Sequence, residues 1–242
     1  MLSKNQIKHI TRLKQKKFRL QDKLFVVEGL KTIHELLKSD LELYQLYTTE
    51  SFNLNAKNEV LIAESELKKI SFLKSPQKAL ALFKIPESKP IDTNQLVLAL
   101  DDVRDPGNLG TIIRLCDWFG VTDLVCSNET ADCYNPKVIQ ATMGSIARVN
   151  ISYLDLPSFI NNQNGPVFGA FMDGKNVYKT PLPDQGILIM GNEANGISED
   201  IANLVTQKIA IPRFGDRQET ESLNVATATS ILLSEFKRNL AL

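Results

Sequence analysis

Short apolar runs alternate with amphipathic stretches through residues 95–242. Runs rich in Leu, Ile and Val are typical of buried strands, and apolar residues three or four positions apart are typical of helices. Repeated strand-then-helix order predicts a mostly parallel α/β sheet with helices on both faces. The expected strands span residues 96–100, 123–126, 147–153, 166–171, 186–190 and 207–211, and the expected helices span residues 109–119, 135–145, 157–162, 198–205 and 222–240.

A smaller set of elements precedes this region and predicts a small α/β domain. Residues 86–95 combine two prolines with small polar residues, a composition typical of a linker. The sequence therefore predicts one domain over residues 1–90 and another over residues 95–242. The expected elements of the first are helices over residues 3–23, 30–38 and 64–71, and strands over residues 24–27, 43–48, 60–63 and 79–85.

Charge is distributed unevenly although the net charge is zero. Residues 1–94 hold 17 Lys and Arg against 11 Asp and Glu, whereas residues 95–242 hold 11 against 17. The first 23 residues alone carry eight basic side chains and a single acidic one, Asp22. Such a surface suits the phosphate backbone of a nucleic acid, although a solvated terminal helix without a specific partner has the same composition.

Other features of the composition narrow the class of protein. No apolar stretch approaches the roughly 20 residues of a membrane span, and no apolar core of a secretion signal follows the basic start. Cys116, Cys126 and Cys133 form no Cys-x-x-Cys pair, which favours reduced thiols in the cytoplasm. With only two histidines, His9 and His34, we expect no metal site.

Three strand-to-loop junctions carry the candidate chemistry. In order, they contain Asn108-x-Gly110-x-x-x-Arg114, then Gly191-Asn192-Glu193-Ala194-Asn195-Gly196, then Ile211-Pro212 followed by Ser222-Leu223-Asn224-Val225-Ala226. Loops at the carboxyl ends of strands are where α/β proteins place their active sites. The three motifs, in this order, resemble the signature motifs of the SpoU family of RNA ribose 2'-O-methyltransferases, and the resemblance covers roughly residues 95–242.

The resemblance implies a function and a fold. SpoU enzymes transfer a methyl group from S-adenosyl-L-methionine to a ribose 2'-hydroxyl of structured RNA, and we favour ribosomal RNA over transfer RNA. They have a trefoil-knotted C-terminal domain and form homodimers, so we expect the final helix to contribute to a contact between two copies. The segment Phe25-Val26-Val27-Glu28-Gly29-Leu30-Lys31 also resembles the N-terminal substrate-binding domain of many members.

The resemblance also assigns residues, each with an alternative. Catalytic roles fall to Arg114, Asn108, Ser222 and Asn224, and cofactor contacts to Gly191, Glu193, Ile211 and Leu223. The basic N-terminal run, next to such an enzyme domain, further predicts RNA contacts by Lys14, Lys16, Lys17 and Arg19. Arg114 is either a general base or, because guanidinium stays charged, an anchor that stabilises the developing alkoxide. Asn108, Ser222 and Asn224 are otherwise helix caps, and residues 191–196 otherwise form only a strand-to-helix turn.

Two other classes of function stay open. An RNA-binding module of the same fold without turnover would explain the basic N-terminal region. A nucleotide-binding oxidoreductase would use the same α/β architecture, but the Gly-x-Gly-x-x-Gly fingerprint is missing. The motifs contain no His or Cys, which argues against a hydrolase triad. A long charged loop over residues 213–221 separates the two parts of the third motif.

Overall fold

The computed structural model describes residues 1–242 except 55–56, 215–221 and 239–242. The chain forms two compact units. Unit 1 contains Met1–Glu87 together with Asp132–Ala147, and unit 2 contains Ser88–Ala131 together with Arg148–Leu242. The segment 132–147, which the sequence assigns to the second domain, therefore groups with the first unit.

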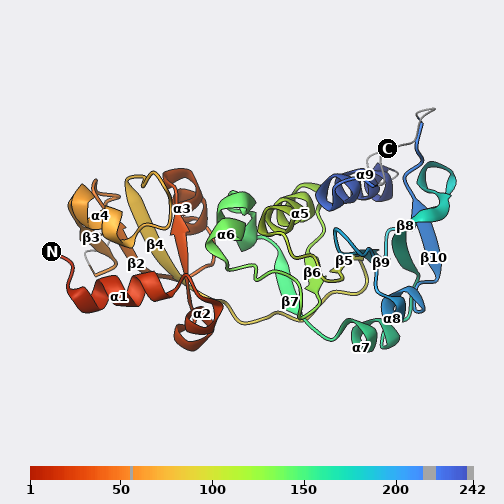
Figure 1. The fold of residues 1–242 in the computed structure, drawn as a ribbon, viewed down its shortest axis with the longest axis horizontal. Coiled ribbons are helices and arrows are strands. Elements are labelled where there is room, and N and C mark those ends of the chain that lie inside the picture. The colour runs from red at the N-terminus through yellow and green to blue at the C-terminus, as the bar shows by residue number, and fades with distance from the viewer. Residues whose placement is uncertain (55–56, 215–221, 239–242) are drawn as a thin grey trace. The chain divides into compact units, whose positions relative to one another are not determined.

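Unit 1 is built on a four-stranded sheet in the order β1-β4-β2-β3 (Figure 1). β4 pairs antiparallel with β1 and β2, and β3 runs parallel to β2. Because both neighbours cover it, β4 is buried over five of its six residues. The strands are β1 (Leu24–Glu28), β2 (Leu43–Thr48), β3 (Glu59–Leu61) and β4 (Ala79–Lys84), and the helices are α1 (Lys4–Arg12), α2 (Lys16–Asp22), α3 (Leu30–Leu37), α4 (Glu64–Ile70) and α6 (Pro136–Thr142).

The N-terminal segment forms two helices, so the expectation of one helix over residues 3–23 is wrong. Ser3 caps α1 in a capping box with Gln6, and the helix ends at Leu13. The guanidinium of Arg19 donates to the carbonyl oxygens of Leu13 at 2.7 Å and Lys14 at 2.8 Å. These side-chain bonds satisfy carbonyl groups that have no partner within the ended helix.

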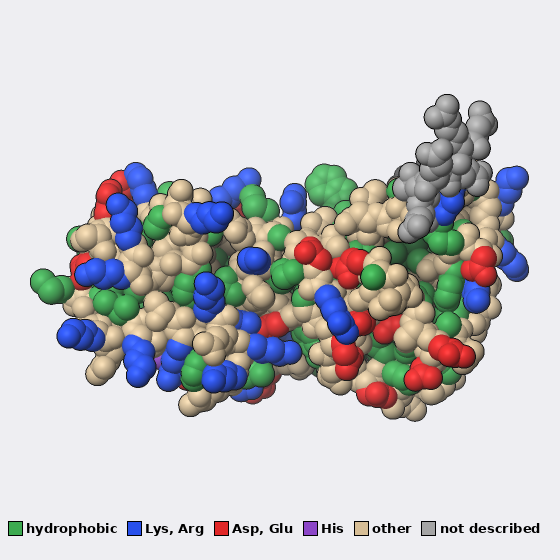
Figure 2. All heavy atoms as spheres, in the orientation of Figure 1, with side chains coloured by type: hydrophobic (Ala, Val, Ile, Leu, Met, Phe, Trp, Pro, Cys, Tyr) green, Lys and Arg blue, Asp and Glu red, His purple; other side chains and the backbone are tan. Residues whose placement is uncertain are grey.

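Arg19 lies inside unit 1, which corrects its predicted role as an RNA contact. Its side chain is only 2% exposed and forms an ion pair with Asp132. A buried guanidinium needs a carboxylate and hydrogen-bond acceptors, and Arg19 has both. The basic residue is therefore structural, whereas Lys14, Lys16 and Lys17 are exposed. Figure 2 shows basic side chains gathered over the part of unit 1 that holds α1 and α2.

Segment 132–147 completes the core of unit 1. Tyr134 packs on Phe25 of β1 with ring centroids 4.9 Å apart, and Phe25 also stacks on Phe83 of β4. α6 follows, begins at Pro136 with Asn135 as its cap, and packs against β1. It is shorter than the expected helix over residues 135–145, because the chain leaves the helix at Met143 in a left-handed conformation. Residues far apart in sequence therefore share one hydrophobic core.

Unit 2 confirms the expected α/β fold. Its six strands pair in parallel throughout, in the order β10-β8-β9-β5-β6-β7 (Figure 1). The strands are β5 (Leu96–Leu100), β6 (Asp123–Cys126), β7 (Asn150–Tyr153), β8 (Val167–Asn176), β9 (Gly186–Met190) and β10 (Gln207–Ala210), and the helices are α5 (Pro106–Phe119), α7 (Leu156–Asn161), α8 (Glu199–Ala202) and α9 (Val225–Arg238), with short 3-10 turns η1 (Ser145–Ala147, in unit 1) and η2 (Val177–Lys179).

Helices cover both faces of this sheet. On one face, α7 and α8 pack Phe159, Ile160 and Ile201 against strand residues such as Val97. On the other face, α9 packs against α5, and Phe236 meets Phe168 of β8 edge to face at 5.1 Å. Burial on both faces explains why these strands are nearly continuous apolar runs.

β8 is longer than its apolar run, which predicts a strand only to residue 171. The polar continuation to Asn176 pairs with β10, with Lys175 opposite Ile209 after a shift in register. A Cβ atom on Gly174 would lie 2.5 Å from the backbone of Ile209, so only glycine fits here. The close approach of the β8 and β10 backbones therefore extends β8 over residues that show no hydrophobic alternation.

No helix in the described part of the chain has the length and apolar character needed to cross a membrane.

Loss of the buried guanidinium should destabilise the fold. In Arg19→Met, Asp132 would keep its charge with no cationic partner, and we expect the free energy of unfolding to fall by about 3–5 kcal/mol. Lys78→Met is the control, because Lys78 pairs with Glu50 on the surface, where such pairs contribute about 0–1 kcal/mol. Urea denaturation measures both, and equal losses would contradict the structural role of Arg19.

Candidate active site

Three segments meet at the carboxyl ends of β5, β9 and β10. They follow Leu100, Met190 and Ala210, the last residues of these strands. Parallel strands direct their carboxyl ends toward one edge of the sheet. The structure thus brings together residues that lie more than 100 positions apart, including Asn108 and Asn224.

The first segment leads into α5 and leaves the Asn108 side chain available. Asp105 caps this helix, with its carboxylate accepting the N–H of Asn108 at 2.8 Å, and Pro106 occupies the first turn. The helix therefore begins three residues before the expected start. The alternative role of Asn108 as a helix cap is wrong, because Asp105 fills it.

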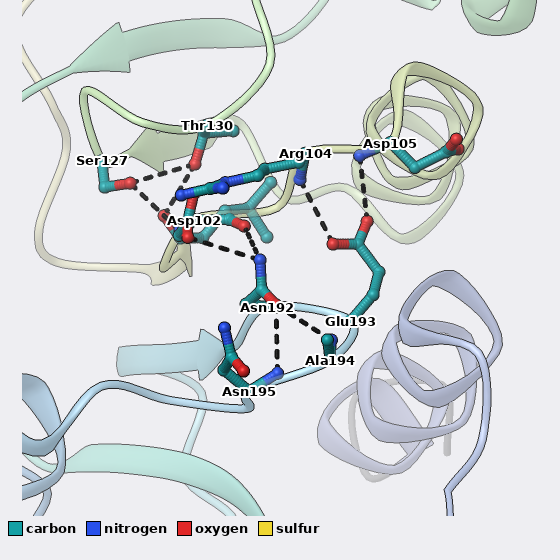
Figure 3. Close-up of polar contacts among 10 residues, drawn as sticks. Asp102, Arg104, Asp105, Ser127, Thr130, Asn192, Glu193, Ala194 and Asn195 are labelled. Atoms are coloured by element: carbon teal, nitrogen blue, oxygen red, sulfur yellow. Dashed lines mark hydrogen bonds and ion pairs between the residues drawn. The ribbon is translucent and has the colours of Figure 1, made fainter.

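Glu193 binds three donors of that first segment. Its carboxylate accepts the backbone N–H groups of Arg104 at 3.2 Å and Asp105 at 3.1 Å, as Figure 3 shows. It also accepts Nδ2 of Asn108 at 3.0 Å. Burial acts to raise the pKa of the Glu193 carboxyl, but these hydrogen bonds more than offset it and hold the pKa below its usual value of 4.5.

The loop that carries Glu193 is held in a tight turn. Asn192 accepts the N–H groups of Ala194 at 2.9 Å and Asn195 at 3.0 Å, and its Nδ2 donates to the carbonyl of Asp102 at 2.7 Å (Figure 3). A Cβ atom on Gly191 would lie 2.2 Å from the backbone of Gly196, so this turn requires glycine. The expected turn is present, and its Asn joins two of the three segments.

The third segment joins the other two through Asn224. Its Oδ1 accepts the N–H of Ala226 at 2.9 Å and of Thr227 at 3.3 Å, which caps α9. Its Nδ2 donates to Oδ1 of Asn108 at 2.9 Å. Asn224 therefore serves as a cap and as a link, and a continuous hydrogen-bonded chain runs from Asn224 through Asn108 to Glu193.

A cavity of about 1080 Å³ opens beside this chain of hydrogen bonds. Its wall combines backbone of the tight turn with apolar side chains from β8, β10 and α9. This volume and mixed lining are typical of small-molecule sites. Of the predicted site residues, the cavity is lined by Gly191, Glu193, Ile211, Ser222, Leu223 and Asn224.

Some lining residues carry no motif. Phe171 and Met172 line the cavity from the middle of β8, and Arg213 lines it from the segment after β10. The sequence did not predict Phe171 and Met172 as site residues. Its apolar run predicts a strand that ends at residue 171, so the continuation of β8 was not expected. Asp216, Arg217, Glu219 and Glu221 of the charged loop lie outside the described residues.

Two groups of predicted residues lie apart from the cavity. Arg114 is exposed on α5, less than two turns after Asn108, and does not line it. No carboxylate of the described residues pairs with it. Lys14, Lys16 and Lys17 belong to unit 1, where the ammonium of Lys17 lies 4.7 Å from the ring centroid of Phe18.

Comparisons with known proteins agree with these motifs. Residues 95–234 match the model of the SpoU rRNA Methylase family. The chain belongs to the SpoU family. Residues 4–81 match the MRM3-like substrate binding domain. A 23S rRNA (guanosine(2553)-2'-O)-methyltransferase from Bacillus subtilis is 30% identical over 241 residues, which cover 96% of each chain.

Solved structures of SpoU-type proteins share the whole fold. A TrmH-family structure from Porphyromonas gingivalis is 39% identical, with a TM-score of 0.90 over 99% of both chains. An AdoMet-bound rRNA methyltransferase from Sinorhizobium meliloti is 29% identical, with a TM-score of 0.88 over 99% of this chain and 97% of that one. The SpoU chain described here therefore matches such proteins over both of its units.

The lowered pKa of Glu193 predicts a pH-dependent contribution to stability. A carboxyl whose pKa is lower in the folded state stabilises that state above its unfolded pKa, and the contribution is lost as the pH falls through the folded pKa. We expect Glu193→Gln to be less stable than the original protein at pH 7, and the difference to shrink below about pH 4.5. Urea denaturation across pH 3–7, with exposed Glu87→Gln as control, measures this difference. A gap that is constant with pH would contradict it.

The two roles of Asn224 can be separated by substitution. Asn224→Asp keeps an oxygen that caps α9 but loses the amide donor to Asn108, whereas Asn224→Ala loses both. We expect Asn224→Ala to lower the free energy of unfolding by about 1 kcal/mol and Asn224→Asp to change it little. Both variants should lose the activity proposed below. Full activity in Asn224→Asp would show that the bond to Asn108 is dispensable.

Proposed function

We propose that this SpoU protein transfers a methyl group from S-adenosyl-L-methionine to a ribose 2'-hydroxyl of ribosomal RNA. The observation that carries the proposal is the hydrogen-bonded chain from Asn224 through Asn108 to Glu193 at the edge of the cavity. It unites all three family motifs at one place. The relatives with ribosomal RNA in their names favour this substrate over transfer RNA.

The cavity fits the cofactor. Backbone groups of the turn 191–196 reach a ligand without obstruction by side chains, as recognition of an adenosine requires. Ile211 and Leu223 add apolar surface to the same cavity. When bound, S-adenosylmethionine supplies an electrophilic methyl group. We assign its binding to Gly191, Ile211 and Leu223, with Glu193 holding the turn in position.

Residues at the edge of the cavity prepare the acceptor hydroxyl. Asn108 is fixed by Glu193 on one side and Asn224 on the other, so its position does not depend on substrate. Ser222 is exposed and lines the cavity, where its hydroxyl can contact the ribose. Preorganised polar groups lower the barrier because they need not reorient during the reaction.

Arg114 serves as a phosphate anchor and as a stabiliser of the developing alkoxide. A guanidinium stays protonated in proteins and offers a planar set of donors that suits phosphate. Its lack of a carboxylate partner among the described residues leaves these donors available. General-base catalysis would require a deprotonated guanidine, which is chemically costly.

The proposed assembly is a homodimer in which each copy helps to complete the site of the other. Arg114 is exposed and does not line the cavity of its own chain, so a second copy is the natural source of this group. Trp118, one turn further along α5, is 83% exposed. An exposed tryptophan on α5, which packs against α9, suits an isologous contact between two copies of the chain.

The knot of the family is also part of the proposal. β10 lies at one edge of the sheet, whereas Asn224, at the start of α9, bonds to Asn108 beyond β8 and β9. Ile211 and Ser222, on either side of the undescribed residues 215–221, both line the cavity together with the loop that follows β9. This placement of β10, α9 and that loop is consistent with the knot that we propose.

Residues 1–90 are the proposed RNA-binding domain and residues 95–242 the proposed methyltransferase domain, of which segment 132–147 groups with unit 1. The match of residues 4–81 to a substrate binding domain supports this assignment. Exposed Lys14, Lys16 and Lys17 provide positive charge for phosphate contacts. Cys116, Cys126 and Cys133 are all buried, and buried thiols together with an RNA substrate suit the reducing cytoplasm.

Methyl transfer to RNA tests the function directly. Purified protein is incubated with labelled S-adenosylmethionine and ribosomal RNA from cells that lack the protein. A 2'-O-methyl group blocks alkaline cleavage of the adjacent phosphodiester, so the label should appear in alkali-resistant dinucleotides. Cofactor binding without transfer to any RNA would favour the alternative, an RNA-binding module without turnover. No cofactor binding at millimolar concentration would contradict the proposal.

Arg114→Ala should reduce turnover at least a hundredfold while cofactor affinity, measured by calorimetry, stays unchanged. The loss follows because a preorganised donor to developing charge contributes roughly two to three orders of magnitude in rate. Lys137→Ala removes an exposed helical cation from α6 and should keep turnover. Substantial activity in Arg114→Ala would assign the alkoxide contact to another residue.

A further inference from the structure

Two aromatic side chains lie exposed in unit 2 beyond the family motifs. Phe214 is 82% exposed and Tyr178 is 38% exposed. Their ring centroids lie 6.3 Å apart with an angle of 32° between the rings. Water contact with a phenylalanine ring is unfavourable, so such an exposed pair is typical of a binding surface.

This pair stands next to the cavity. Tyr178 belongs to η2, which follows directly on β8, and β8 supplies Phe171 and Met172 to the cavity wall. Phe214 follows Arg213, which lines the cavity. Both rings therefore lie on segments that leave the site of methyl transfer, where the RNA strand must enter and leave.

Positive charge surrounds these segments. Lys175, Lys179 and Lys208 are exposed, and Lys175 lies opposite Ile209, a residue of the cavity wall. The ammonium of Lys208 lies 4.6 Å from the ring centroid of Phe171. Figure 2 shows basic side chains at the end of unit 2 that holds β8 and β10.

The local charge contrasts with the rest of the sequence around it. Residues 95–242 have six more acidic than basic side chains, yet Lys175, Lys179, Lys208 and Arg213 all fall on the segments beside the cavity. Asp173 is the acidic residue on the extension of β8. The sequence after Phe214 adds Arg217 together with Asp216, Glu219 and Glu221, outside the described residues. On the described segments, the grouped exposed lysines suit an anionic ligand.

We propose that Tyr178 and Phe214 form a stacking platform for a base of the RNA substrate next to the methylated nucleotide. Lys175 and Lys179 hold the adjacent phosphates. The inference rests on the proposed function, because it places the RNA strand at the mouth of the methyltransferase cavity. It adds a contact in unit 2 to the basic surface of unit 1.

Single-stranded RNA fits this surface better than a protein partner does. Aromatic rings beside lysines are the usual means of binding unpaired nucleotides, since every base has a face that stacks and every linkage carries a charge. Bases within a duplex are stacked on each other and cannot use the platform. The surface should therefore select a loop, bulge or other unpaired segment around the target ribose.

Substitution of Phe214 tests the platform. Phe214→Leu keeps an apolar side chain but removes the ring, and Phe214→Trp keeps a ring. We expect Phe214→Leu to weaken binding of a single-stranded RNA oligonucleotide by roughly fivefold to hundredfold, measured by fluorescence anisotropy. Phe214→Trp should bind like the original protein. Asn161→Ala, which changes an exposed side chain of α7 in unit 2 outside the proposed RNA surface, is the control and should change little.

Binding of duplex RNA provides the specificity control. The platform predicts that Phe214→Leu loses affinity for the single strand but not for a duplex of the same sequence. In methyl transfer, the KM for RNA should rise by the same factor while kcat and the affinity for S-adenosylmethionine stay unchanged. Equal loss for single strand and duplex, or no loss for either, would overturn the platform.

The lysines have their own readout. For single strands, the slope of log K against log salt concentration is negative, and each lost phosphate contact reduces its magnitude by about 0.7. Lys175→Gln and Lys179→Gln should each show this decrease, and an unchanged slope in both would remove the phosphate contacts from the proposal. Both lysines are exposed, so we expect each substitution to leave the fold intact.

The outcomes separate this inference from the proposed function. If the protein transfers methyl groups and Phe214→Leu has an unchanged KM, only the platform is wrong. If it transfers none, the proposed function fails, and the anisotropy series still decides whether Phe214 binds RNA. Sedimentation of Phe214→Leu tests whether the rings instead contact a second copy of the chain. A changed oligomeric state with unchanged RNA affinity would show such a contact and overturn the platform.

Discussion

The carboxylate of Glu193 holds the segments of the candidate active site together. It accepts hydrogen bonds from two backbone N–H groups ahead of α5 and from the side chain of Asn108, and Asn108 in turn receives the amide of Asn224. A charged acceptor strengthens each of these bonds. Asn108, Glu193 and Asn224, from three segments outside the sheet, are therefore held in one arrangement. The cavity depends on them, since its wall includes the turn that carries Glu193 and the segment that carries Asn224.

Much of this arrangement could be predicted from sequence because its signals are local. The apolar runs of β5 and β9 predict buried parallel strands, and the order of the three motifs predicts that their loops serve one reaction. The roles of individual polar residues were less accessible. Asn108 could equally have been a helix cap, and only the position of Asp105 three residues earlier decides between the two.

Other features depend on partners distant in sequence. Nothing around Arg19 distinguishes it from Lys16 or Lys17, and its buried partner, Asp132, lies 113 positions away. The polar end of β8 has no periodicity, and it is a strand because β10 approaches the backbone at Gly174. Hydrophobic periodicity in a sequence predicts only those elements that bury a face against a core. It cannot predict a strand that is held by backbone contact, or a buried cation that is held by one carboxylate.

The return of segment 132–147 to unit 1 has a consequence for the order of events during synthesis. The ribosome completes residues 1–87 first, but Phe25 and Arg19 lack Tyr134 and Asp132 until residue 134 has emerged. By then β5 and β6 of unit 2 have already been made. A first domain that waits for a segment from the middle of the second cannot fold as each residue appears. The cluster that contains Ile10 and Leu80 lies wholly within the first 82 residues, but the contact of Phe25 with Tyr134 forms only after two of the six strands of unit 2 have been synthesised.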